Sequence, residues 1–151
     1  MSRFIWLVAW ILAGWVLIAP GTLAEDAATD PLAGEWLPIA MELGADKLPD
    51  AVLKATKLSL KGGFYEVTVG RSTPDRGKII TNQRAVPKTM DIIGAEGPNK
   101  GKTILAIYEI KDDQLTICYA LTGEKRPDKF ATGGEKNIFL AIYKRKTLPV
   151  R

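Results

Sequence analysis

The chain has no histidine and only one cysteine, Cys118, among its 151 residues. Without histidine it cannot form a Ser-His-Asp triad, a Cys-His dyad or a zinc site built on histidine. A single cysteine also excludes disulfides within the chain and zinc sites that need paired cysteines. We therefore expect no metal, no cofactor and no enzymatic activity, because any catalysis would have to rest on tyrosine, lysine or carboxylate side chains.

The chain also lacks a large excess of positive or negative charge. The formal net charge is +4, with 25% charged and 46% hydrophobic residues. This composition is typical of a globular domain and excludes a disordered or collagen-like chain. The small positive excess does not indicate a nucleic-acid partner, particularly in an exported protein.

The first 24 residues have the pattern of a secretory signal peptide. Arg3 supplies a positive charge, residues 4–19 form an apolar run, and Thr22-Leu23-Ala24 carries small residues at the two positions that a signal peptidase reads. We expect residues 1–24 to be removed, residues 25–32 to form a linker, and the protein to be periplasmic or extracellular. The alternative is membrane anchoring by an uncleaved segment 4–19, although a full span needs about 20 apolar residues.

From residue 33 onward, short apolar runs alternate with turn residues, which predicts strands joined by tight turns. No helix of crossover length lies between the runs, so the strands should be antiparallel and form a barrel or a sandwich. We expect one domain over residues 33–146 and a tail over residues 147–151. The predicted elements are one short helix, residues 48–55, and strands over residues 36–43, 57–61, 64–69, 78–81, 89–93, 103–110, 115–121 and 138–145.

Gly34-Glu35-Trp36 opens the first of about eight predicted strands, and Arg145 lies near the end of the last one. This combination resembles the lipocalin-type (calycin) barrel. The resemblance implies that Trp36 packs across a closed end of the barrel with Arg145, or alternatively Lys144, lying over the indole. A cation over an indole face gains about 0.5–2 kcal/mol.

The segments GGFYEVTVG and GPNKGKTILAIYEIKDDQLTICYALTGEKRPDKF extend this pattern over residues 32–146. Together with the opening Gly34-Glu35-Trp36, they resemble an uncharacterised lipocalin-like domain family typical of planctomycetes. The resemblance implies an eight-stranded antiparallel barrel and a preceding signal peptide. It implies no particular activity.

The first predicted strand contains an irregularity at Pro38. Leu37, Ile39 and Met41 share one face by alternation, whereas Trp36 lies on the opposite face. Proline cannot donate to a strand ladder and often marks a bulge. A bulge near Pro38 would bring Trp36 and the later apolar residues to the same side.

Tyrosines provide the first candidates for ligand binding. Tyr65, Tyr108 and Tyr119 lie on predicted strands, as does Tyr143. Their hydroxyl groups could orient a small apolar ligand inside a barrel. Aromatic residues also favour sheets simply because they pack well there, so ordinary packing is the alternative.

The segment Arg126-Pro127-Asp128-Lys129-Phe130 provides two further candidates. Arg126 could present its guanidinium to an anion at the rim of a barrel, with Phe130 beneath the loop. The alternative is a structural strap that closes one end of the barrel. For Cys118 we expect a buried structural thiol, with redox activity or pairing between chains as the alternative, because no histidine could activate it.

The sequence thus predicts an exported, non-enzymatic, lipocalin-like barrel that binds a small apolar or amphipathic molecule. The alternative is an interaction or structural module of the cell envelope whose barrel is filled by side chains. An eight-stranded barrel permits either case. An interior cavity of about 300 Å³ or more, open at one end, would favour the ligand carrier.

Overall fold

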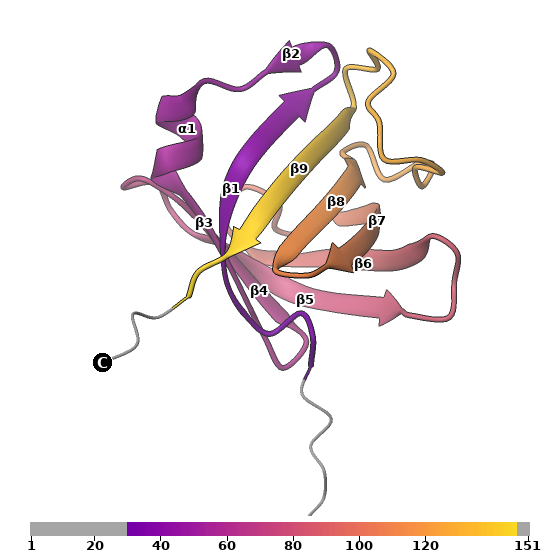
Figure 1. Cartoon of the computed structure of the whole chain (residues 1–151), viewed down its shortest axis with the longest axis horizontal. Helices are drawn as coiled ribbons and strands as arrows, with labels where there is room; N and C mark the ends of the chain where they lie inside the picture. Colours follow the sequence, from indigo (N-terminus) through magenta and orange to yellow (C-terminus); the bar gives the residue numbers. More distant parts are fainter. Residues whose placement is uncertain (1–29, 148–151) are drawn as a thin grey trace, which may run out of the picture.

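The computed structural model describes residues 30–147. The expected signal peptide or anchor and most of the expected linker and tail lie outside the described residues. Every strand pairs antiparallel with its neighbours, and β1 pairs with both β3 and β9, which closes the sheet into the barrel seen in Figure 1. The strands of the barrel are β1 (Gly34–Leu43), β3 (Thr56–Lys61), β4 (Phe64–Val69), β5 (Asp75–Asn82), β6 (Lys88–Glu96), β7 (Thr103–Lys111), β8 (Gln114–Ala120) and β9 (Ile138–Arg145).

The prediction of an eight-stranded antiparallel barrel with one short helix is therefore confirmed. Helix α1 (Asp50–Ala55) begins after Pro49, and Asp50 and Lys54 carry charges that suit the two ends of its dipole. One element was not predicted. The two-residue strand β2 (Asp46–Lys47) folds back on the end of β1 and lies beside α1 at one end of the barrel (Figure 1).

The predicted bulge near Pro38 is present. Pro38 pairs with Tyr143 and Ala40 with Ile142, which leaves Ile39 as the extra residue of β1. The bulge shifts the alternation by one position, so the side chains of both Trp36 and Met41 are buried in one core. The later apolar residues Ile39 and Leu43 remain exposed, so the expected gathering of apolar residues on one side holds only in part.

Two strands extend into segments that we predicted to be loops. β5 begins at Asp75 and β6 ends at Glu96, and these ends pair through Arg76 with Glu96 and through Gly77 with Gly94. The sequence did not predict these strand ends because their residues are polar or glycine, and such residues are depleted in strands. In the structure, the Arg76 side chain forms ion pairs with Glu66 and Glu96 across the three neighbouring strands.

The expected linker also ends earlier than predicted. Leu32 is 2% exposed and belongs to the main core, and its backbone oxygen accepts a hydrogen bond of 2.9 Å from Trp36 Nε1. Asp30 caps this turn, because its side chain accepts from the Leu32 N–H at 3.0 Å. The residues just before β1 therefore form part of the closed base of the barrel.

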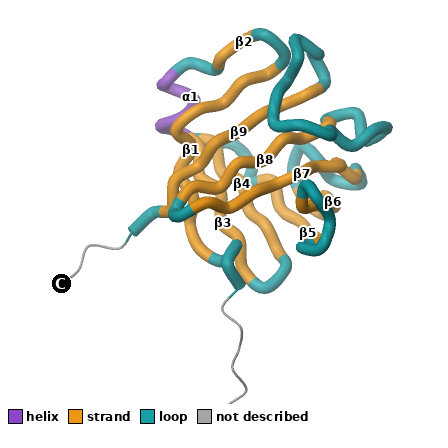
Figure 2. Tube along the Cα trace, turned by 45° about the vertical axis from the view of Figure 1, so that its right-hand side comes forward, coloured by secondary structure: helices purple, strands orange, loops and turns teal. Residues whose placement is uncertain are grey.

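The outer face of the barrel carries a second, smaller core. Ile107, Cys118, Ala120 and Ile138 point away from the interior and pack under the long β8–β9 loop, residues 121–137, which we call the strap. The strap is the orange-to-yellow loop in Figure 1 and one of the long loops coloured teal in Figure 2. It shields from water a side of the sheet that a simple barrel would expose.

Candidate functional site

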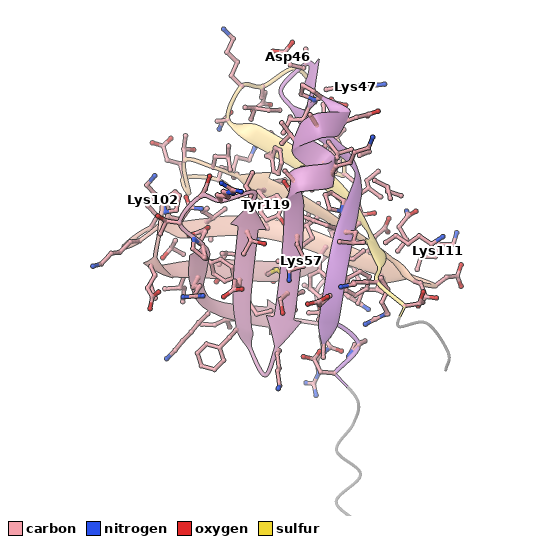
Figure 3. All side chains as sticks on the ribbon, turned by 90° about the vertical axis from the view of Figure 1, so that its left-hand side faces the viewer. Asp46, Lys47, Lys57, Lys102, Lys111 and Tyr119 are labelled. Atoms are coloured by element: carbon pink, nitrogen blue, oxygen red, sulfur yellow. The ribbon has the colours of Figure 1, made fainter. Side chains whose placement is uncertain are left out.

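A cavity of about 240 Å³ occupies the half of the barrel next to α1. Its walls are mostly aliphatic and aromatic, with Val69 and Leu121 at the rim, both about 40% exposed. Leu48 and Val52 of the segment around α1 also line it. Tyr119, labelled in Figure 3, also lines the cavity. The other apolar lining residues include Met41, Leu58, Leu60, Val67, Ile79, Met90, Ile92, Ile104, Ile117 and Phe139.

The opposite end of the barrel is closed by Trp36, which is fully buried. The Arg145 guanidinium carbon lies 4.1 Å from the centroid of the Trp36 ring. The two nitrogens Nη1 and Nη2 of Arg145 donate to the backbone oxygens of Ala33 at 2.6 Å and Pro31 at 2.7 Å. The cation that lies over the Trp36 ring is thus Arg145. The alternative, Lys144, is exposed.

Gly34 completes this base because the Arg145 side chain passes directly over it. A Cβ at residue 34 would lie 2.9 Å from Arg145 Nη1, and the backbone there has φ of +137°, which side-chain-bearing residues rarely adopt. The three residues that carry the resemblance to the lipocalin-type barrel therefore pack together: Gly34, Trp36 and Arg145.

Three tyrosines contribute hydroxyl groups to the cavity wall. Tyr119 Oη and Tyr143 Oη lie 3.3 Å apart, and either can be the donor. Burial raises the pKa of Tyr143 to about 12, and it raises that of Tyr119 well above the usual range, with Tyr143 and Tyr65 adding to the effect. The phenols of Tyr119 and Tyr143 are therefore neutral at physiological pH and can donate hydrogen bonds.

The Tyr65 hydroxyl is buried beside the Asp75 carboxylate, although it makes no well-aligned hydrogen bond within residues 30–147. The residue is 5% exposed. Burial, followed by the negative charge of Asp75, raises the pKa of Tyr65 to about 12. The hydroxyl oxygen itself has almost no accessible surface, so Asp75 rather than the open cavity is its polar neighbour.

The position of the Tyr65 ring depends on a glycine in the neighbouring strand. Tyr65 and Gly77 are register partners, and a Cβ on Gly77 would lie 2.8 Å from Tyr65 Cε1. The same Cβ would lie 1.9 Å from the backbone oxygen of Ile93. Only glycine fits there, and its missing side chain gives the ring its place against the sheet.

Two polar residues of the cavity were not predicted from the sequence. The side-chain amide of Asn99 donates to Asp75 Oδ2 at 2.6 Å, and its backbone N–H donates to Asp75 Oδ1 at 3.3 Å. Both residues line the cavity. Asp75 begins β5 and Asn99 lies in the β6–β7 loop, so only the folded barrel brings them together; no spacing in the sequence indicated the pair.

Three of the sequence candidates do not line this cavity. Tyr108 is buried in the main core, where its ring contributes packing. Phe130 lies on the outside of the barrel against the second core. Tyr108 was a candidate because of its hydroxyl, and Phe130 was expected beneath a loop at the rim, but the sequence did not reveal how deep or on which side of the sheet each would lie.

Arg126 is likewise a structural residue rather than a rim residue that could meet an anion. Its Nη1 donates to the backbone oxygens of Met90 at 3.1 Å and Ala106 at 2.8 Å, and its Nη2 meets Asp91 Oδ1 at 2.5 Å. The guanidinium is therefore already engaged in fastening the strap to β6 and β7. The strap alternative describes this segment, although it covers the side of the barrel and not one end.

Cys118 is a buried free thiol beneath the strap. Burial raises its pKa above the usual value, with a small opposing effect from the Ala131 carbonyl, 3.9 Å from Sγ. A thiol with a raised pKa forms little thiolate at neutral pH and is a poor nucleophile. This environment fits a packing role.

Metal and membrane features were also sought in the part of the chain that the structure describes. Within residues 30–147 no group of three or more acidic or cysteine side chains is arranged to hold a metal ion. In the same residues no helix has the length and apolar character needed to cross a membrane. Comparison of the chain with protein-family models, with curated proteins and with solved structures found no match.

Proposed function

We propose that this protein is an exported, non-enzymatic, lipocalin-like barrel that binds a compact apolar or amphipathic molecule in its interior. The observation that carries the proposal is the cavity of about 240 Å³, which is lined mostly by apolar side chains. Burial of apolar surface stabilises such a complex by about 25 cal/mol per Å².

The size of the cavity limits the ligand. A volume of about 240 Å³ is below the 300 Å³ that sequence reasoning set as the mark of a ligand carrier. The cavity thus falls short of the size that was expected to favour a carrier. The ligand is therefore a single-ring or short-chain molecule. What supports the carrier over a cell-envelope module with a filled barrel is that side chains leave part of the interior open.

The non-enzymatic part of the proposal rests on the residues available. The chain has no histidine, and its one thiol is buried outside the barrel. Kinship with lipocalin-type barrels is supported by the stack of Arg145 on Trp36 at the closed base. Membership of the lipocalin-like family of planctomycetes rests on the sequence segments alone. It remains part of the proposal.

Native mass spectrometry of the protein purified from its own source tests the proposal. We expect a small non-covalent adduct that is lost on mild activation, and thermal stabilisation by single-ring and short-chain molecules. Repeated absence of an adduct, with no thermal shift across such a panel, would contradict ligand binding.

Two phenylalanine variants on one strand provide a matched control. Val67 lines the cavity, whereas its neighbour Thr68 does not, because successive side chains of a strand point to opposite faces. Val67→Phe should fill the cavity and abolish binding, while Thr68→Phe should retain it. Equal binding by both folded variants would place the ligand elsewhere.

Export is tested by the mass of the protein isolated from cells. Cleavage after Ala24 predicts a mature chain that begins at Glu25 and stays soluble after cell lysis. An intact N-terminus in the membrane fraction, resistant to alkaline carbonate, would instead support anchoring by residues 4–19.

A further inference from the structure

The outer face of strands β4, β5 and β6 carries exposed apolar side chains. Phe64 and Ile80 are each more than half exposed, and Ile93 is also open to solvent. Phe64 is the register partner of Lys78, which in turn pairs with Ile93, so these residues lie side by side across three strands. The strap buries the apolar residues on the outer face of β7, β8 and β9. Within residues 30–147 nothing comparable covers β4 to β6.

The turn between β5 and β6, residues 83–87, continues this apolar face beyond Ile80. Val86 lies in the turn and is 99% exposed. The Arg84 N–H donates to Asn82 Oδ1 at 3.0 Å, which gives the turn a defined shape. Figure 1 shows the turn projecting from the barrel on the side away from α1. The most exposed apolar side chain of this face is therefore also the one that stands out from the barrel.

Unpaired cations lie among these apolar residues. The stretch 76–90 contains four basic residues and no acidic one. Of the four, Lys78, Arg84 and Lys88 are exposed and form no ion pair within residues 30–147. The Lys78 ammonium lies 5.9 Å from the centroid of the Phe64 ring. Apolar and cationic side chains are thus interleaved on one surface.

The acidic residues of the same three strands do not compensate these cations. Glu66 and Glu96 both pair with Arg76. Asp91 pairs with Arg126 of the strap, and the Asp75 carboxylate accepts hydrogen bonds from Asn99. The charges of Lys78, Arg84 and Lys88 therefore remain available to a negatively charged partner.

We propose that this surface docks the protein on an anionic lipid membrane, and we call it the docking face: Phe64, Lys78, Ile80, Arg84, Val86 and Lys88. Lysine and arginine meet the phosphate groups of anionic lipids, while apolar side chains enter the boundary between headgroups and acyl chains. A projecting turn with an exposed valine at its surface suits insertion into such a boundary better than it suits a peptide, which needs a groove. The inference goes beyond the proposed function and does not depend on any ligand in the cavity.

Vesicle sedimentation tests the proposal with the chain from Glu25 onward, which contains the whole barrel. We expect binding to vesicles of equal parts phosphatidylglycerol and phosphatidylcholine, and at least about tenfold weaker binding to pure phosphatidylcholine. Raising the salt to about 1 M, where the Debye length is about 3 Å, should release most of the protein.

Two pairs of glutamine substitutions remove the same amount of charge from different places. Arg84→Gln with Lys88→Gln should weaken binding by roughly fivefold for each cation removed. The matched control is Lys47→Gln with Lys54→Gln, two exposed positions on β2 and α1, and it should retain the wild-type affinity within about twofold. Thermal unfolding verifies that both variants fold.

A tryptophan reporter locates the contact. Trp36 is the one tryptophan of the chain from Glu25 onward, and it is fully buried, so a new surface tryptophan can be followed separately. The emission of Val86→Trp should shift to shorter wavelength on anionic vesicles, whereas that of Ala51→Trp, at an exposed position of α1, should not.

Each remaining outcome would overturn the proposal. Equal binding to both kinds of vesicle, binding to neither, or undiminished binding by Arg84→Gln with Lys88→Gln would exclude docking through these cations. An unshifted Val86→Trp spectrum on bound vesicles would place the contact on another face. Binding to polyglutamate without binding to anionic vesicles would assign the docking face to an acidic protein instead.

Discussion

Arg145 secures the closed base of the barrel through several contacts at once. It stacks on the buried Trp36 ring and donates hydrogen bonds to the backbone oxygens of Pro31 and Ala33. The stack was expected from the resemblance to the lipocalin-type barrel, which rests on the glycine-x-tryptophan opening and on a basic residue at the end of the last strand. The hydrogen bonds to residues 31 and 33 were not predicted, because that segment reads as a polar linker.

Arg145→Ala should lower the free energy of unfolding by about 2–4 kcal/mol, since it removes the stack and two charge-assisted hydrogen bonds. Arg145→Lys should cost roughly half of that, because an ammonium keeps the charge but not the planar fork. Lys144→Ala, at the exposed neighbouring position, is the control and should change stability by less than about 0.5 kcal/mol. Urea unfolding measures all three, and equal effects of Arg145→Ala and Lys144→Ala would refute the structural role.

Tyr143 should make the protein sensitive to alkali. Burial raises its folded-state pKa to about 12, from 10.0 for an exposed phenol. Its stabilising contribution is therefore complete below pH 10 and is lost as the pH rises toward 12, at about 1.4 kcal/mol per unit of pKa difference. Unfolding measured across this range should be less steeply pH-dependent in Tyr143→Phe than in the wild type. The same alkaline profile in both would show that the Tyr143 hydroxyl is not buried in solution.

Individual polar residues of the cavity were the hardest part to predict. Tyr65 and Tyr119 were candidates because they lie on predicted strands, and both line the cavity. Asp75 and Asn99 were missed, since they lie in segments that read as loops and come together only when β5 and β6 pair. Which face a tyrosine occupies depends on strand register, and the bulges that set the register are only partly visible in a sequence.

At the scale of elements, most strands and hairpins followed from the alternation of apolar residues. Strand β2 and the polar ends of β5 and β6 could not be predicted from this alternation. They are held by cross-strand pairing, including the ion pairs of Arg76, and pairing partners distant in sequence leave no local pattern. A structural strap was one of the two expectations for residues 126–130, but the side of the barrel that it covers was not predicted.

The strap depends on Arg126, which fastens it to β6 and β7, and it covers Cys118. Arg126→Ala should let the strap open locally and increase the rate of Cys118 modification by a thiol-specific reagent about tenfold or more under native conditions. Lys129→Ala, an exposed position in the same loop, should leave the rate unchanged.

Hydrogen exchange of the strap amides provides an independent readout of the same opening. If Cys118 in Arg126→Ala reacts no faster than in Lys129→Ala, the thiol is protected by the sheet itself and the strap has a different role.

At the scale of the whole molecule, the sequence predicted an antiparallel barrel or sandwich, and the pairing of β1 with β9 shows that the sheet closes. Whether the interior is hollow could not be predicted. That property depends on how side chains from all strands fill a common volume, and a few side-chain methyl groups decide between a filled core and a cavity of about 240 Å³. The closed base and the open half next to α1 together give the molecule the form of a small cup.

Methyl NMR of the mature domain during a titration with acetophenone would show where a ligand binds. The isoleucines divide into two groups: Ile79, Ile92, Ile104 and Ile117 line the cavity, whereas Ile107 and Ile138 lie under the strap outside the barrel. We expect saturable shifts confined to the first group. Shifts centred on the second group, or none at millimolar probe, would contradict a ligand-binding interior.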